Sequence, residues 1–134
     1  MTEVLKKYKL RFYVSDNMPK CDGGTIGEDF GFYIGWMDFE TIKKSDIEET
    51  ISMLEDIISG QLSEREFDIV DIAIAALAQQ HTTYFAWDYD AYTSPLSSSN
   101  HDYSMPTQDF KDIIVEWKAF VEKFRDNGSP LNGL

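Results

Sequence analysis

The amino-acid sequence predicts an α+β fold in which a small, mainly antiparallel sheet of about three strands packs against about three helices. Some segments have an apolar residue at every second position, which is typical of half-buried strands, and others at every third or fourth, which is typical of amphipathic helices. These segments follow in the order strand, strand, helix, helix, strand, helix. A doubly wound parallel sheet would need strands and helices in regular alternation, so this order favours α+β.

Three segments are predicted to be strands. In residues 7–14 apolar side chains alternate with lysine and arginine, which indicates a strand with one buried face. Residues 30–39 are rich in aromatic and β-branched side chains, and we expect this second strand to pair antiparallel with the first. Residues 16–29 between them contain a proline and three glycines, which predicts a long irregular loop. Residues 82–89, rich in threonine and aromatic residues, form the third predicted strand.

Three further segments are predicted to be helices, over residues 45–60, 63–80 and 107–127. The first two open with the sequence S-x-x-E, a capping box in which the serine and glutamate side chains satisfy free backbone N–H groups. All three carry apolar residues at spacings of three and four. Residues 91–106 are rich in serine and are predicted to form a long loop, of a kind that often has a function.

The length of 134 residues predicts a single domain over 1–134, with residues 129–134 as a flexible tail. Hydrophobic residues make up 43% of the chain, enough to form a core without a metal or a disulfide. The one cysteine, Cys21, excludes an intrachain disulfide and fits a reducing compartment. The N-terminal residues lack the apolar run of a signal peptide, and the longest apolar stretch is far shorter than the ~20 residues of a membrane span. We therefore expect a cytoplasmic protein.

Acidic residues dominate the charge of the chain, 24 against 12 basic ones, which gives a net charge of −12. Residues 45–110 hold thirteen carboxylates and a single cation, Arg65. Such a field repels nucleic acid and anionic membranes and attracts basic proteins. We therefore expect a basic protein partner, with no direct nucleic-acid partner and no membrane partner. The basic residues of the first predicted strand are explained by protection of an exposed sheet edge.

Motifs of known metal, nucleotide or catalytic sites are missing from the sequence. There is no H-E-x-x-H, no paired C-x-x-C, no EF-hand loop, no P-loop and no G-x-S-x-G. We therefore expect no metal, no cofactor and no catalytic residues, and we predict that the protein is not an enzyme. One alternative stays open, a small enzyme or ligand-binding domain that uses Cys21, His81 and His101.

Aromatic residues and carboxylates alternate in the third predicted strand and the loop after it. Alternation places Thr83, Phe85, Trp87 and Tyr89 on one side of this strand and Tyr84, Ala86, Asp88 and Asp90 on the other. Because carboxylates prefer water, we expect the second set to face solvent. Tyrosines are enriched at the centres of protein interfaces, and carboxylates complement lysine and arginine. The sequence therefore predicts an exposed acidic and aromatic patch.

In its size, its acidity and the cluster Trp87-Asp88-Tyr89-Asp90, the chain resembles the immunity proteins that protect bacteria from contact-dependent or polymorphic toxins. The resemblance is one of overall character and includes no family-specific motif. It implies an inhibitor that binds a basic toxin, a nuclease, one to one and covers its active site. A nucleic-acid mimic of phage type, aimed at restriction or repair proteins, is an alternative with the same electrostatics.

The residues predicted to bind the partner lie in two segments. The main contacts come from the third predicted strand and the loop after it, and further carboxylates on the second predicted helix extend the surface. They are Tyr84, Asp88, Tyr89, Asp90, Tyr92 and Asp102, together with Glu64, Glu66, Asp68 and Asp71.

Overall fold

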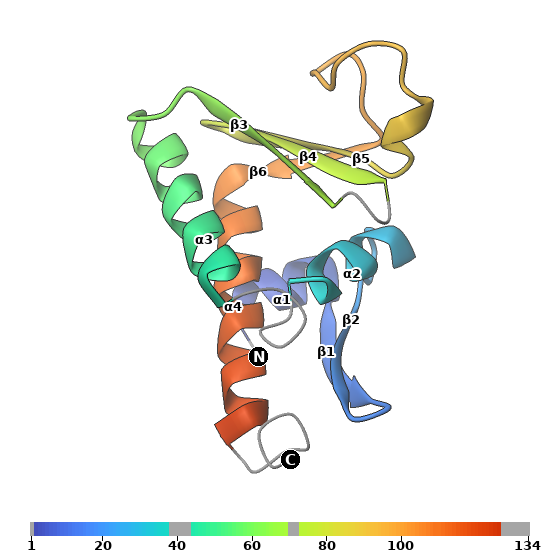
Figure 1. The fold of residues 1–134 in the computed structure, drawn as a ribbon, viewed down its shortest axis with the longest axis vertical. Coiled ribbons are helices and arrows are strands. Elements are labelled where there is room, and N and C mark those ends of the chain that lie inside the picture. Colours follow the sequence, from blue (N-terminus) through green and yellow to red (C-terminus); the bar gives the residue numbers. More distant parts are fainter. Residues whose placement is uncertain (1, 38–43, 70–72, 127–134) are drawn as a thin grey trace. The chain divides into compact units, whose positions relative to one another are not determined.

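The computed structural model describes residues 2–37, 44–69 and 73–126 (Figure 1). The described part is an α+β structure with two antiparallel sheets, one of two strands and one of four, and it holds more strands than the sequence analysis predicted. Its elements, in chain order, are α1 (Glu3–Tyr8), β1 (Arg11–Ser15), β2 (Met18–Asp22), α2 (Glu28–Gly35), α3 (Lys44–Ser59), β3 (Glu64–Ile69), β4 (Ile74–Gln79), β5 (Thr82–Ala86), the 3₁₀ turn η2 (Tyr89–Ala91), β6 (Tyr103–Pro106) and α4 (Thr107–Asp126).

The chain forms two compact units, which we describe separately. The hairpin unit comprises Met1–Glu49 and Asp112–Leu134, and the sheet unit comprises Thr50–Lys111. The single domain predicted over 1–134 stays a prediction, and the predicted tail 129–134 lies outside the described residues. Among the helices that the structure describes, none has the length and apolar character needed to cross a bilayer.

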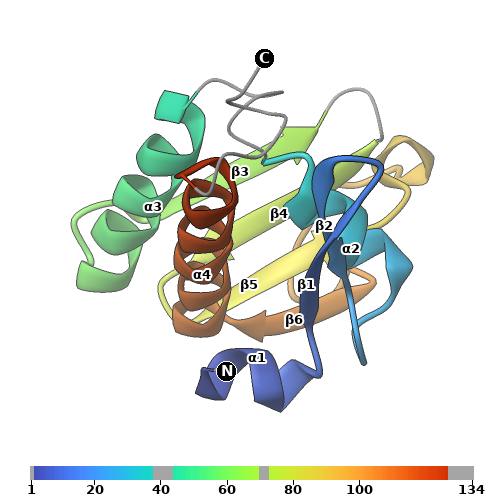
Figure 2. The same cartoon turned by 90° about the horizontal axis from the view of Figure 1, so that it is seen from below.

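The sheet unit is built on four antiparallel strands in the order β3-β4-β5-β6 (Figure 2). On one face, Thr83 and Phe85 are fully buried, as their predicted inward positions require. Tyr89, predicted on the same side, instead packs with Tyr84 on an apolar cluster, because the strand ends at Ala86 and its alternation does not extend to Tyr89. The Phe85 ring meets the ring of Phe110 edge to face, with centroids 5.2 Å apart. Thr107, the first residue of α4, shares a hydrogen bond of 2.8 Å with the Thr83 hydroxyl, and its N–H donates to the carbonyl of His81. These contacts fix the start of α4 to the sheet.

The hairpin unit holds the two-stranded sheet of β1 and β2, with α1, α2 and the later part of α4. The aromatic rings of Phe12, Trp117 and Phe120 pack together, with centroid separations of 5.1 to 5.9 Å. The buried Trp117 also donates its indole N–H to the carbonyl of Met37 at 3.0 Å. Hence a single tryptophan of α4 contacts both the hairpin and the end of the segment that contains α2.

The predicted helix over residues 63–80 is wrong, because this segment forms the hairpin of β3 and β4. In β3, glutamate and aspartate alternate with Arg65 and Phe67, a period of two that fits a strand. The apolar run of β4 pairs with β3 on one side and β5 on the other, so it is a central strand buried on both faces. Strand pairing therefore outweighed the capping-box signal at Ser63.

The predicted strand over residues 30–39 is also wrong where the structure describes it, because α2 occupies this segment. Phe30, Tyr33 and Ile34 recur at the spacing of a helix face, and all three are fully buried. The bulky aromatic composition suggested a strand, but the spacing of the buried residues is helical. Residues 38 and 39 of the predicted strand lie outside the described residues.

The first predicted strand and the loop after it are partly wrong. Helix α1 ends at Tyr8, its C-cap residue Lys9 lies in the left-handed region, and the strand begins only at Arg11. The predicted loop 16–29 contains β2, which pairs with β1 through a two-residue turn. Both turn residues, Asp16 and Asn17, have positive φ, as a type I′ hairpin turn requires. The first strand therefore pairs with β2, while the described part of residues 30–39 forms no strand.

The remaining predicted elements are confirmed in position. Helix α3 and helix α4 each begin within one residue of the predicted start, and β5 begins at the predicted residue Thr82. Strand β5 ends at Ala86, three residues earlier than predicted, and the predicted loop 91–106 contains the short strand β6 at its end.

Candidate functional site

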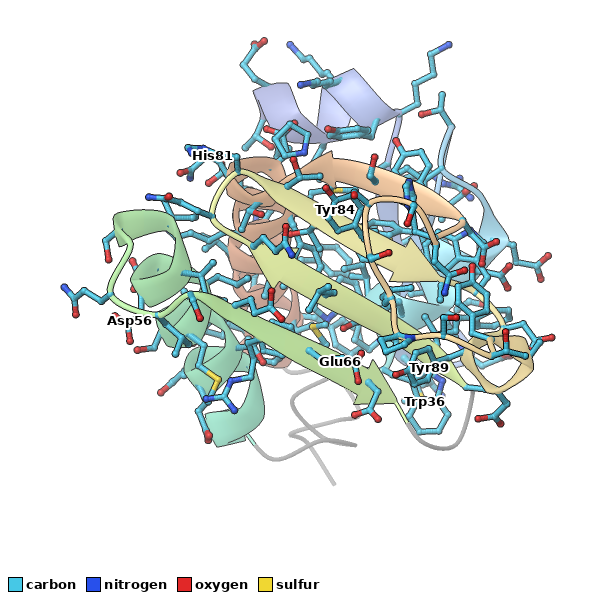
Figure 3. All side chains as sticks on the ribbon, turned by 90° about the horizontal axis from the view of Figure 1, so that it is seen from above. Trp36, Asp56, Glu66, His81, Tyr84 and Tyr89 are labelled. Atoms are coloured by element: carbon cyan, nitrogen blue, oxygen red, sulfur yellow. The ribbon has the colours of Figure 1, made fainter. Side chains whose placement is uncertain are left out.

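One face of the four-stranded sheet carries most of the residues that the sequence analysis assigned to partner binding. The register pairs Glu66 with Leu77 and Leu77 with Tyr84, so these residues lie side by side on adjacent strands. Because alternate residues of a strand point to the same side, Glu64 and Asp68 share this face. We call this surface, together with the loop residues that pack on it, the tyrosine–carboxylate face (Figure 3). Its members are Glu64, Glu66, Asp68, Tyr84, Tyr89, Tyr92 and Asp102.

A small apolar cluster lies beneath the tyrosines of this face. Its buried residues are Ala75, Leu77 and Ala86 of the sheet and Leu96 of the loop that follows η2. Tyr84, Tyr89 and Tyr92 are partly buried and pack against this cluster. The rings of these tyrosines therefore have fixed positions. The prediction that Tyr84 faces solvent is only partly right, because the loop that carries Leu96 covers part of this face.

Tyr89 is held in place at two points. Its backbone N–H donates to the carbonyl of Ala73 at 2.8 Å, and its hydroxyl lies 3.2 and 3.1 Å from the two carboxylate oxygens of Glu66. The hydrogen bond to Glu66 is the main reason that the pKa of Tyr89 is raised, followed by burial and by the charges of Glu66 and Asp68. The neutral phenol therefore acts as a donor to a carboxylate that stays exposed to the solvent.

Tyr92 repeats this arrangement with a different carboxylate. Burial raises the pKa of Tyr92 to about 12, and a hydrogen bond to Asp102 and the charges of Asp102 and Asp88 add to the shift. The rings of Tyr89 and Tyr92 are neighbours, with centroids 6.4 Å apart. Two adjacent phenols are thus each oriented by a carboxylate of the same face.

Asp102 also fixes the loop that carries it. One of its carboxylate oxygens accepts the N–H of Trp87 at 2.7 Å, and its own N–H donates to the carbonyl of Phe85 at 2.8 Å. Further along this loop, the Asn100 side chain donates to the carbonyls of Ser94 and Pro95, at 2.9 and 3.1 Å. The loop is therefore tied to the sheet and to itself, which gives Asp102 a structural role as well as its predicted role in binding.

Cations are missing from the described part of the tyrosine–carboxylate face. Arg65 alternates with Glu64 and Glu66 along β3, so it points to the opposite side of the sheet. Lys111, the other cation of the sheet unit in the described residues, forms an ion pair with Glu55 at 3.4 Å. The carboxylates of this face are therefore not neutralised by basic side chains of their own unit.

The remaining predicted site residues have different positions. Asp88 and Asp90 are exposed in and beside η2, and the charge of Asp88 acts on Tyr92, which places it at the border of the face. Asp71 lies outside the described residues. Glu64, Glu66 and Asp68 were predicted on a helix, where they could not all share one side. In the structure they lie at alternate positions of β3, and all three therefore share one side of the strand.

Two residues of this region, Gln79 and Leu96, were missed by the sequence analysis, which named His101 only for the alternative site. Gln79 lies opposite Glu64 in the register and donates its side-chain N–H to that carboxylate at 3.1 Å. The ring of His101 packs on Tyr84 with centroids 4.9 Å apart, and Leu96 completes the apolar cluster. Recognition of β3 and β4 as a hairpin would have predicted the position of Gln79, but no sequence pattern indicates that Leu96 folds back onto the sheet.

The local environments of Cys21 and His101 give little support to the alternative site of Cys21, His81 and His101. Burial, with the charge of Asp22, raises the pKa of the Cys21 thiol to about 12, so that the reactive thiolate is scarce at neutral pH. The His101 ring is engaged with the carbonyl of Ser97 at 3.0 Å. Over the described ranges, no group of three or more histidine, cysteine, aspartate or glutamate side chains has the arrangement of a metal site.

The tyrosine–carboxylate face is suited to binding a cationic surface. Carboxylates accept charge-assisted hydrogen bonds from lysine and arginine, and the oriented tyrosine rings offer surfaces on which a guanidinium can stack. No protein-family model, curated protein or solved structure matches this chain. The evidence on function therefore comes from the residues of this face.

Proposed function

We propose that the protein is an inhibitor of the immunity or antitoxin type, which binds a basic toxin with nuclease activity one to one in the cytoplasm. The observation that carries this proposal is the row of Glu64, Glu66 and Asp68 along β3, beside tyrosines whose hydroxyls are held by carboxylates. The proposed contacts are the tyrosine–carboxylate face together with Asp88 and Asp90.

The spacing of this row supports a nuclease as the partner. Alternate residues of a strand repeat about every 6.7 Å, so β3 presents negative charges at regular intervals along a line. A nucleic-acid strand also presents its phosphates as a regular line of negative charge. A cleft lined by lysine and arginine for such a strand would attract the carboxylates of β3 in the same way.

The fixed tyrosines support tight binding. A side chain that is already held in one position loses little conformational entropy when a partner docks on it. Tyr89 and Tyr92 pack on the apolar cluster and are oriented by Glu66 and Asp102. They can therefore act as preformed anchors at the centre of an interface with a charged rim.

The test is capture of the partner from the native cell, with the purified protein as bait and identification by mass spectrometry. We expect a basic nuclease whose activity the wild-type protein inhibits, with affinity that falls as salt rises. The variant Glu66→Gln with Asp68→Asn should lose most of this affinity. The matched control, Glu49→Gln with Asp56→Asn, removes two exposed carboxylates of α3 and should bind as the wild type does.

Two results would contradict the proposal. If both double variants bind the captured nuclease as tightly as the wild type, the tyrosine–carboxylate face is not the contact surface. If the captured partner is a restriction or repair protein, the chain is a nucleic-acid mimic of phage type and not an immunity protein.

A further inference from the structure

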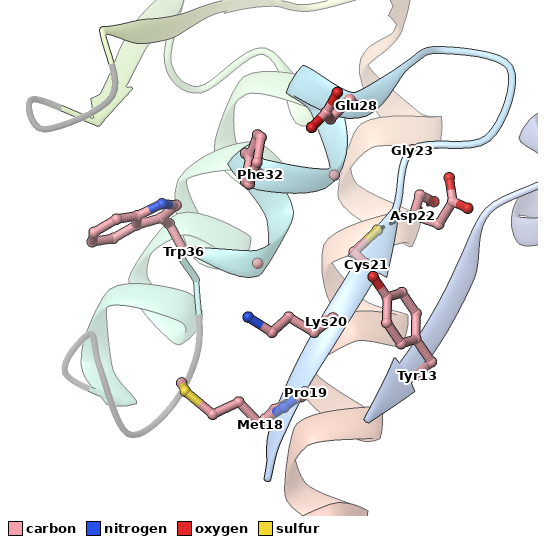
Figure 4. A pocket seen from close by; sticks show the side chains of 12 residues that line it. Tyr13, Met18, Pro19, Lys20, Cys21, Asp22, Gly23, Glu28, Phe32 and Trp36 are labelled. Atoms are coloured by element: carbon pink, nitrogen blue, oxygen red, sulfur yellow. Dashed lines mark hydrogen bonds between the residues drawn. The ribbon is translucent and has the colours of Figure 1, made fainter. Parts of the chain in front are cut away.

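The hairpin unit contains a pocket of about 580 Å³ between β2 and α2 (Figure 4). This volume lies within the range of sites that hold small molecules, roughly 300–1,000 Å³. The pocket belongs to a different unit from the tyrosine–carboxylate face and has no part in the function proposed above. Its lining residues are supplied by β1, β2, the loop after β2, α2 and the residue that follows α2.

Two glycines of α2 explain why the pocket exists. A Cβ atom at Gly31 would lie 2.4 Å from the carbonyl oxygen of Cys21, so the helix backbone touches β2 at this point. A Cβ atom at Gly35, one helical turn later, would meet nothing within 4 Å. The helix is therefore close to the strand at Gly31, and the space beside Gly35 is left open.

The walls of the pocket are mainly aromatic and apolar. Phe32 of α2 and Trp36, the residue that follows α2, are four residues apart and line the pocket (Figure 4). Phe32 is 52% exposed although it is a large apolar side chain. Met18 and Pro19 of β2 line the pocket as well. An exposed phenylalanine beside an open space of this size offers a flat surface on which another ring can stack.

Lys20 is the charged residue of the pocket that has no other role in the described structure. The carboxylate of Asp22 accepts the N–H of Gly24 at 3.0 Å, and Glu28 lies in the first turn of α2, where the helix dipole favours a negative charge. Lys20, by contrast, forms no ion pair with any described residue, and its side chain extends from β2 toward α2 (Figure 4). Among the lining residues, Lys20 is therefore the group that can donate a charge-assisted hydrogen bond to a carboxylate of a ligand.

We propose that this pocket binds a small planar aromatic molecule with one carboxylate. The ring lies against Phe32 and Trp36, and the carboxylate accepts a hydrogen bond from the ammonium group of Lys20. The thiol of Cys21 stays neutral and does not repel the anion. No covalent step is involved, because the pocket offers a stacking surface and a cation but no activated nucleophile.

Two probes that differ only in charge test this proposal. Naphthalene-2-carboxylate carries the ring and the anion, and naphthalene-2-carboxamide carries the same ring without charge. Binding is measured by amide chemical shifts of the ¹⁵N-labelled full chain, with residues of β2 and α2 as reporters. We expect the carboxylate to bind about tenfold more tightly than the amide.

Two variants test the assigned contacts. Lys20→Gln should weaken binding of the carboxylate about tenfold and leave binding of the amide unchanged. Gly35→Leu should fill the pocket and abolish binding of both probes, and a spectrum that is otherwise like that of the wild type confirms that it folds. If Lys20→Gln binds the carboxylate as the wild type does, or if shifts arise outside β2 and α2, the proposal is wrong. These outcomes do not depend on the nuclease partner.

Discussion

The tyrosine–carboxylate face and the pocket beside α2 are built in opposite ways. The face is formed by side chains that alternate along strands, and two of its tyrosines, Tyr89 and Tyr92, are fixed by hydrogen bonds to neighbouring carboxylates. The pocket is the space left open beside Gly35, next to an exposed ring and a lysine without an ion-pair partner among the described residues. One region presents a rigid charged surface, and the other presents an open space.

This difference separates the kinds of ligand that the two regions suit. A preformed row of carboxylates and oriented tyrosines matches a large basic surface, because many contacts form at once with little loss of entropy. A pocket with aromatic walls and one cation matches a small anion with a ring.

The largest effect is expected from the exposed carboxylates beside η2. In the double variant Asp88→Ala with Asp90→Ala, affinity for the nuclease partner should fall by about 2–5 kcal/mol, because two charges that face cations are removed. The melting temperature should stay nearly unchanged, since Asp88 makes no capping hydrogen bond and both residues are exposed. Isothermal titration calorimetry and thermal unfolding measure the two quantities. Unchanged affinity would remove η2 from the interface and leave only the row on β3.

A second prediction concerns the glycines of the pocket. Gly31→Ala should lower the free energy of unfolding by about 1–3 kcal/mol, because its Cβ would collide with the carbonyl oxygen of Cys21 at 2.4 Å. Gly35→Ala is the matched control on the same helix and should leave stability unchanged or raise it slightly, because its Cβ meets nothing within 4 Å. Urea unfolding compares them. Equal stability of the two variants would contradict the close approach of α2 to β2.

The sequence predicted the residues of the charged face far better than those of the pocket. Tyrosines and carboxylates are residue types that suit binding of a basic partner, so the sequence predicts Tyr89, Asp102 and Glu66 as contacts. It places Glu66 on a helix, whereas Glu66 lies on a strand. Their proximity could not be read from the sequence, because it depends on the pairing of β3 with β4. The alternation of apolar and charged residues in β3 indicates a strand, but the capping-box sequence at Ser63 indicates the start of a helix.

The pocket could not be predicted, because it depends on the direction in which α2 runs past β2. Gly31 and Gly35 lie in a segment predicted to be a strand, whereas in the structure they are the close-approach and open positions of helix α2. A helical reading of Phe30, Tyr33 and Ile34 was available from their spacing. Lys20, in contrast, was in a segment predicted to be a loop, so nothing connected it with the aromatic residues of α2.

The smallest effect concerns pH and distinguishes fixed tyrosines from free ones. The pKa of Tyr92 is raised from 10.0 to about 12 by burial and by its hydrogen bond to Asp102. A group whose pKa is higher in the folded protein contributes stability that is present below pH 10 and is lost as the pH rises toward 12. The wild-type protein should therefore lose free energy of unfolding over this interval, and Tyr92→Phe should lose less.

Urea unfolding at several pH values between 10 and 12 measures this difference in slope. Cys21 and Tyr89 also have raised pKa values and add to the decline in both proteins, so the comparison isolates the share of Tyr92. Asp56→Asn, which changes an exposed carboxylate of α3, should follow the wild-type curve. Parallel curves for the wild type and Tyr92→Phe would mean that the hydroxyl titrates alike in the folded and unfolded chains. Tyr92 would then be a mobile side chain, and the argument for preformed anchors would rest on Tyr89 and Glu66 alone.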